Sequence, residues 1–100
     1  MQLLEEIVNL QHKKIIMESN EIVRKQILEV VENQLRDNNP PETKQTYARL
    51  IKMGISKENA KKYIAQCVTV EIFNVMKHSQ PFNEKRFIKN LHNLPKKPIE

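Results

Sequence analysis

The spacing of apolar residues predicts a chain built from helices. Between residues 22 and 35 the apolar side chains recur every three or four positions, as on the buried face of an α-helix. Ser19 and Asn20 have the small polar side chains that cap helix N-termini, so we expect this helix to begin there and to end near Asn38. Its expected core residues are Ile22, Val23, Ile27, Leu28, Val30, Val31 and Leu35.

A double proline divides the chain after this helix. Proline disfavours helical geometry in the preceding residue and suits the first turn of a new helix, so Asn39-Pro40-Pro41 should end one helix and begin another over residues 41–53. Gly54, the only glycine, stands where a left-handed helix terminus is expected, and Ser56 can cap the helix that follows over residues 57–77. The sequence therefore predicts a helix-turn-helix pair around Gly54.

The last third of the chain contains a short helix and a basic tail. Ser79-Gln80-Pro81 interrupts the long helix, and Asn83 can cap a new one that ends near Leu91 or His92. Two prolines within residues 95–100 then favour an extended basic tail.

The N-terminal segment has a less regular apolar pattern. Between Leu3 and Ile16 it indicates a helix that either stops near Glu18 or continues into the next one. Alternating strand patterns and hairpin turns are nearly absent from the chain. We therefore expect an all-α fold: a single domain over residues 1–100, built as a small bundle of four to five helices.

Composition fits a cytoplasmic protein. Hydrophobic residues make up 39% of the chain and charged residues 29%, and the longest apolar runs, such as Ile15 to Met17, are far too short to span a membrane. The N-terminus lacks the pattern of a secretory signal. A single cysteine, Cys67, cannot close an intramolecular disulfide, which fits a reducing compartment.

Charge is distributed unevenly along the chain. Residues 1–39 hold five Lys or Arg against seven Asp or Glu, whereas residues 40–100 hold twelve against five. A cationic half attracts an acidic protein or a nucleic acid, although a solvated lysine face is the simpler interpretation. The expected cationic contacts are Lys57, Lys61, Lys62, Lys85, Arg86, Lys89, Lys96 and Lys97.

Residues for catalysis or cofactor binding are scarce. One glycine cannot build a phosphate-binding loop, and Cys67 lies on an apolar stripe where it should be inert. Glu71 lies beside the same apolar stripe, and if its carboxylate is buried it needs a partner that compensates its charge. Glu32 could face it across the bundle, which would give the skeleton of a carboxylate metal site; a structural partner is the alternative. We expect no cofactor and a binding protein rather than an enzyme.

The pair of helices around Gly54 also invites a nucleic-acid-binding interpretation. Lys57, Lys61 and Lys62 would be available to phosphates on the second helix of residues 41–77. Two features weaken it: Arg49 falls where such motifs usually place an apolar contact, and the second helix is longer than a usual recognition helix. An ordinary antiparallel helix pair is the alternative.

Several short motifs resemble a family of small all-helical bacterial proteins classified as a domain of unknown function. The resemblance covers about residues 22–94 and rests on these segments: Val31-Glu32-Asn33-Gln34, Asn39-Pro40-Pro41, Ala60 to Ile64, Val70-Glu71-Ile72-Phe73, Pro81-Phe82 and Leu91 to Pro95. Members of that family carry histidines where this chain has Leu28 and Lys61-Lys62, alongside glutamates that match Glu32 and Glu71. The resemblance implies a bacterial, cytoplasmic helical protein and implies no activity. If those histidines bind a metal in the relatives, that capacity is lost here, which leaves Glu32 and Glu71 as remnants or as structural partners.

These observations favour a protein-protein interaction module with a basic C-terminal half. Its partner would be an acidic protein or a second copy, because the apolar density from Ile15 to Leu35 would suit dimerisation through the N-terminal helices. Nucleic-acid binding through residues 41–77 is the alternative, and a carboxylate metal site at Glu32 and Glu71 is the third hypothesis.

Overall fold

The computed structural model describes residues 20–99, and the helix expected between Leu3 and Ile16 lies outside them. The described residues form four helices and no strand, which confirms the all-α class. The helices are α2 (Asn20–Asp37), α3 (Pro41–Lys52), α4 (Lys57–His78) and α5 (Glu84–Asn93). Each boundary falls close to the residue at which the sequence predicts it.

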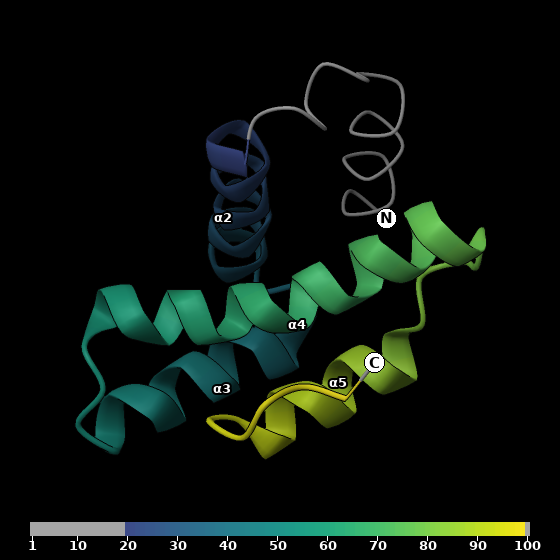
Figure 1. The fold of residues 1–100 in the computed structure, drawn as a ribbon. Helices are drawn as coiled ribbons and strands as arrows, with labels where there is room; N and C mark the ends of the chain where they lie inside the picture. Colours follow the sequence, from purple (N-terminus) through teal and green to yellow (C-terminus); the bar gives the residue numbers. More distant parts are fainter. Residues whose placement is uncertain (1–19, 100) are drawn as a thin grey trace.

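Helix α4 is the centre of the fold. It packs against each of the other three helices: α2 stands across one side of it, while α3 and α5 lie along the other (Figure 1). Helices α3 and α5 also contact each other, and so do α2 and α3. The longest helix is therefore packed against other helices on two sides, and its exposed residues face outward.

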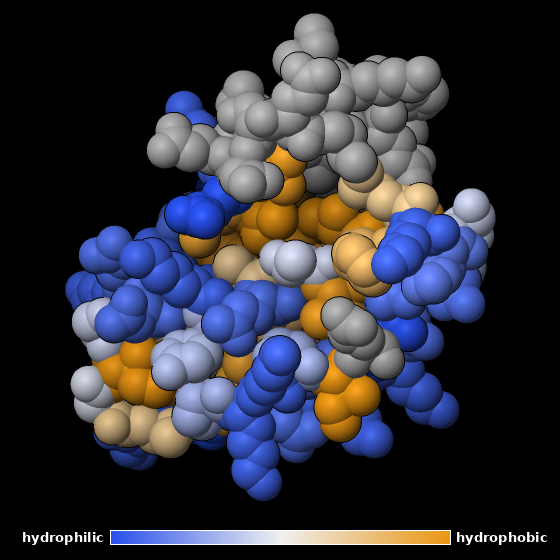
Figure 2. Space-filling view, in the orientation of Figure 1, coloured by the Kyte–Doolittle hydropathy of each residue, from blue (hydrophilic) through white to orange (hydrophobic). Residues whose placement is uncertain are grey.

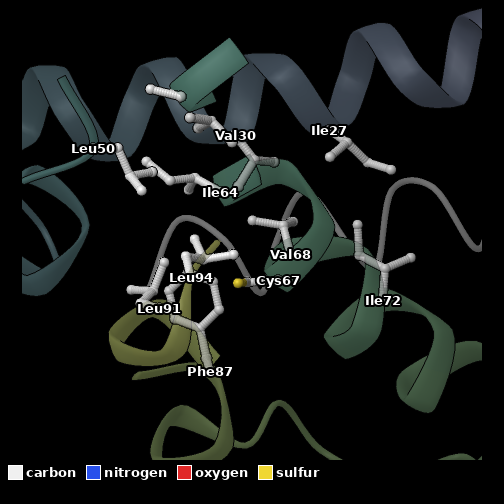
Figure 3. Close-up of a cluster of buried hydrophobic side chains, with 12 residues drawn as sticks. Ile27, Val30, Leu50, Ile64, Cys67, Val68, Ile72, Phe87, Leu91 and Leu94 are labelled. Atoms are coloured by element: carbon white, nitrogen blue, oxygen red, sulfur yellow. The ribbon is translucent and has the colours of Figure 1, made fainter. Parts of the chain in front are cut away.

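The core gathers around the inward side of α4. Its buried residues are joined by Val30 and Val31 of α2, Leu50 of α3 and a group from α5 and the residue after it (Figure 3). The α4 members are Ala60, Ile64, Cys67, Val68 and Ile72, and the C-terminal members are Phe87, Leu91 and Leu94. Leu28, expected in the core, is only half-buried and lines a surface groove.

Local chemistry explains where the helices begin and end. Pro41 occupies the first position of α3, where its missing N–H costs nothing. Gly54 has a φ of +92°, a backbone conformation that favours glycine, in the turn between α3 and α4. The Ser56 side chain then accepts a hydrogen bond from the Asn59 N–H at 3.2 Å, and the Asn83 side chain accepts one from the Arg86 N–H at 3.0 Å.

Two long-range polar contacts fix the helices against one another. The Thr43 hydroxyl of α3 donates to the Gln34 Oε1 of α2 at 2.8 Å, and both side chains are buried. Arg49 of α3 donates to the carbonyls of Leu91 and Leu94 at 3.0 and 2.8 Å, at the C-terminal end of α5. The Leu91 carbonyl also accepts a hydrogen bond from the Leu94 N–H at 3.2 Å, and a cation at the C-terminal end of a helix interacts favourably with the helix dipole. Within residues 20–99, no helix combines the length and the apolar character needed to cross a membrane.

Candidate functional site

Glu71 is fully buried, and its partner is Arg86. The guanidinium Nε donates to Oε2 of Glu71 at 2.6 Å and Nη2 donates to Oε1 at 2.9 Å, while the Asn83 backbone N–H donates to Oε1 at 2.9 Å. The carboxylate hydrogen bond holds the pKa of Arg86 above its ordinary value. Arg86, expected as a contact for a partner, therefore joins α5 to α4 within the chain, and four-fifths of its side chain is shielded from solvent.

Glu32, the other carboxylate of the hypothetical metal site, pairs with Lys61. The Lys61 Nζ lies 2.5 Å from Glu32 Oε1, and this hydrogen bond raises the pKa of the lysine. Each of the two carboxylates thus has a cation of its own. In the described part of the chain, no group of three or more His, Cys, Asp or Glu side chains is arranged to hold a metal ion.

Cys67 belongs to α4, one turn before Glu71, and is buried in the hydrophobic core. Burial, followed by the negative charge of Glu71, raises the pKa of the thiol to about 12. Because the thiolate is the reactive form, this environment opposes nucleophilic chemistry at neutral pH.

The basic residues expected to contact a partner separate into two groups. Three form ion pairs: Arg86 with Glu71, Lys61 with Glu32, and Lys62 with Glu58 at 3.4 Å one helical turn away. The other five are exposed, and none forms an ion pair with a carboxylate of residues 20–99: Lys57, Lys85, Lys89, Lys96 and Lys97.

The basic tail is fixed to the fold. Asn90 of α5 is buried, and its side chain forms two hydrogen bonds with the backbone of Ile99: Nδ2 donates to the carbonyl and Oδ1 accepts from the N–H, both at 2.9 Å. Residues 95–99 contain no helix, and this double contact returns them alongside α5 (Figure 1). Lys96 and Lys97 therefore occupy defined positions on the surface.

The outward side of α4 carries a stripe of residues spaced alternately by four and three positions. We call it the α4 stripe, and it consists of Asn59, Tyr63, Gln66, Val70, Phe73 and Lys77. At 100° per residue these positions share one side of the helix, on which Gln66 and Phe73 are exposed, while Tyr63 and Val70 are half-buried at its border with the core and Tyr63 packs against the core cluster. Phe73 is 40% exposed, and the Lys77 ammonium lies over its ring at 4.8 Å. The step of seven from Tyr63 to Val70 is visible in the sequence, but spacing alone does not distinguish this stripe from an ordinary solvated face.

Among the grooves that border the α4 stripe, two extend to another helix or to the tail. The α4–tail groove has a volume of about 750 Å³ and is lined by Tyr63, Gln66, Thr69, Val70, Pro95, Lys97 and Pro98. The α2–α4 groove, of about 540 Å³, is lined by Val23, Arg24, Ile27, Leu28, Lys62, Ala65, Gln66 and Thr69. Figure 2 shows apolar residues gathered where α2 meets α4, with hydrophilic residues over most of the rest of this face. Both grooves are open, so they suit a macromolecular surface better than an enclosed small ligand.

Comparison of the chain with models of known protein families, with curated proteins and with solved structures found no match.

Proposed function

We propose that the protein is a helical interaction module that binds an acidic segment of another protein. The observation that supports this most is that five of the eight expected contact residues are exposed and form no ion pair with a described carboxylate: Lys57, Lys85, Lys89, Lys96 and Lys97. Four of these belong to α5 and the tail that Asn90 holds against it. Their charges are therefore presented by a preorganised surface, which lowers the entropy lost on binding.

The mechanism we propose is electrostatic attraction followed by docking. Uncompensated cations in the C-terminal half increase the rate of encounter with an acidic partner, because long-range attraction guides diffusion. Exposed charges at the rim of an interface each contribute modestly and act mainly on the association rate. Affinity must then come from apolar contacts close to them.

The test is fluorescence anisotropy with a labelled polyglutamate peptide, in competition with unlabelled duplex DNA and single-stranded RNA. We expect salt-sensitive binding of the peptide that the double variant Lys89→Glu/Lys97→Glu weakens by roughly ten-fold. The matched control Lys25→Glu/Lys44→Glu changes the net charge equally, at exposed lysines outside the C-terminal surface, and should weaken binding less. No binding at low salt, or equal losses in the two variants, would contradict the proposal.

Nucleic-acid binding through residues 41–77 is the second candidate. The observation in its favour is that Lys57 and Lys62 are exposed in the first two turns of α4, next to the turn at Gly54. Lys61 is less available to a phosphate because it forms an ion pair with Glu32. Arg49 is less available because it donates to carbonyls at the C-terminal end of α5. If displacement by DNA or RNA is complete, Lys57→Glu/Lys62→Glu should abolish the nucleic-acid affinity, and each lost phosphate contact should reduce the salt dependence by about one unit of slope.

A further inference from the structure

The α4 stripe has the geometry of a helix-docking seam. Its alternating steps of four and three give the seven-residue repeat with which one helix packs against another. From Asn59 to Lys77 the stripe covers about 27 Å at the ordinary rise of an α-helix. The buried face of the same helix is packed into the core, and Tyr63 of the stripe packs against that core, so the stripe is held on a rigid support.

Partly exposed rings and an aliphatic residue give this stripe an apolar centre. Tyr63 and Val70 are half-buried and line the α4–tail groove, and Phe73 lies one turn beyond them with 40% of its surface exposed. Exposed aromatic residues grouped on a rigid surface are frequent anchors of protein interfaces. The three side chains follow the seven-residue spacing with which two helices pack against each other. An extended peptide would instead present every second one of its own side chains to a surface, so a helix is the better match.

The edges of this surface are positively charged. Lys77 lies over the Phe73 ring at one end of the stripe, and Lys97 stands on the opposite wall of the α4–tail groove. No described carboxylate forms an ion pair with either lysine. A docking helix would therefore be favoured by acidic residues beside its apolar seam, just as charges beside the seam of a coiled coil determine its partner.

We propose that the α4–tail groove and the α4 stripe bind an amphipathic helix whose apolar seam is flanked by glutamate or aspartate. This inference rests on the proposed function and specifies the form of its acidic partner. The apolar seam packs on Tyr63, Val70 and Phe73, and the acidic edge faces Lys97. Thr69 and Gln66 also line the groove and would provide polar contacts.

Three synthetic peptides test the inference. The first has leucines at seven-residue seam spacing with glutamates beside them, the second replaces those glutamates by lysines, and the third has the composition of the first in scrambled order. We expect the first peptide to bind, measured by anisotropy of a fluorescent label, and the other two to bind at least roughly ten-fold more weakly. Circular dichroism should show that the first peptide gains helix on binding.

Two protein variants locate the binding. Phe73→Ser should lower the affinity for the first peptide by roughly ten-fold, whereas Met53→Ser should leave that affinity unchanged. Met53 is a matched control because it is a large exposed apolar residue, 54% exposed, that belongs to neither the stripe nor the groove. Both variants alter exposed side chains, and their far-ultraviolet spectra establish that they are folded.

Failure of this inference differs from failure of the proposed function. If the scrambled acidic peptide binds as tightly as the first, or if Phe73→Ser changes nothing, the helix-docking inference is overturned while acidic binding stands. If no acidic peptide binds, both fail. Preference for the lysine peptide would contradict both the charge argument and the proposed partner.

Discussion

Glu71 shows how one buried carboxylate can position two helices. A carboxylate that is fully buried must have its charge compensated, and Arg86 supplies two hydrogen bonds to it. Removal of one partner leaves an uncompensated charge in the core. The pair therefore determines how α5 sits on α4.

Arg86→Ala should accordingly lower the free energy of unfolding by about 3–5 kcal/mol. The matched control is Lys62→Ala, which breaks the exposed pair with Glu58 and should cost less than about 1 kcal/mol. Urea denaturation followed by circular dichroism measures both. Equal and small losses in the two variants would mean that the Glu71–Arg86 contact contributes little to stability.

Cys67 should be unreactive while the protein is folded. With a pKa of about 12, roughly one thiol in ten thousand is ionised at pH 8, and the side chain is also buried. Reaction with Ellman's reagent should be slow in native buffer and fast in guanidinium chloride. Rapid modification of the native protein would contradict the described burial.

At the scale of the helices, the local rules of the sequence identified nearly every boundary. Pro41, Gly54, Ser56 and Asn83 act through their own backbone or their nearest neighbours, so their effects can be predicted without the tertiary structure. The partners of charged residues could not be predicted in this way. Arg49 reaches Leu94, 45 residues along the chain, and only the packed bundle brings those groups together.

For the candidate site too, local sequence rules did not reveal which residues become partners in the folded chain. Sequence charge indicated eight contact residues, and three of them turned out to hold ion pairs within the chain. The α4 stripe was missed because a partly polar seam resembles an ordinary solvated face until the buried face of the helix is known. Once Ile64 and Val68 are placed in the core, the outward position of Phe73 follows from helix geometry.

Gly54 should be sensitive to substitution because of its backbone conformation. Its φ of +92° is strained for residues with a Cβ, although there is open space around it. Gly54→Ala should cost about 1–2 kcal/mol in the free energy of unfolding, and Gly54→Asn should cost less, because asparagine tolerates positive φ better. Urea melts of both variants test this; an alanine variant as stable as the parent would contradict it.

The tail after α5 should depend on Asn90. Asn90→Ala removes both hydrogen bonds to Ile99, so the Ile99 amide should exchange with solvent faster. Asn93→Ala, at an exposed position of the same helix, is the control and should leave that exchange rate unchanged. Hydrogen exchange followed by NMR gives the rates. Similar rates in the two variants would show that the tail is held by other contacts.

At the scale of the whole molecule, part of the excess positive charge of the C-terminal half can be assigned to one surface. Four exposed lysines without a described carboxylate partner belong to α5 and the tail, and one of them, Lys97, extends this surface to the edge of the α4–tail groove. Apolar and cationic groups thus meet along one side of α4. This combination distinguishes a docking surface from a lysine face that only keeps the protein in solution.

The most direct test of this account is NMR mapping of the bound peptide. Isotope-labelled protein is titrated with the leucine peptide whose seam is flanked by glutamate, and the amide shifts are followed residue by residue. We predict that the largest changes occur at Tyr63, Val70, Phe73 and Lys97, with little change around Lys44 on α3. Changes centred on the α2–α4 groove or on the turn at Gly54, or no changes at all, would contradict the account.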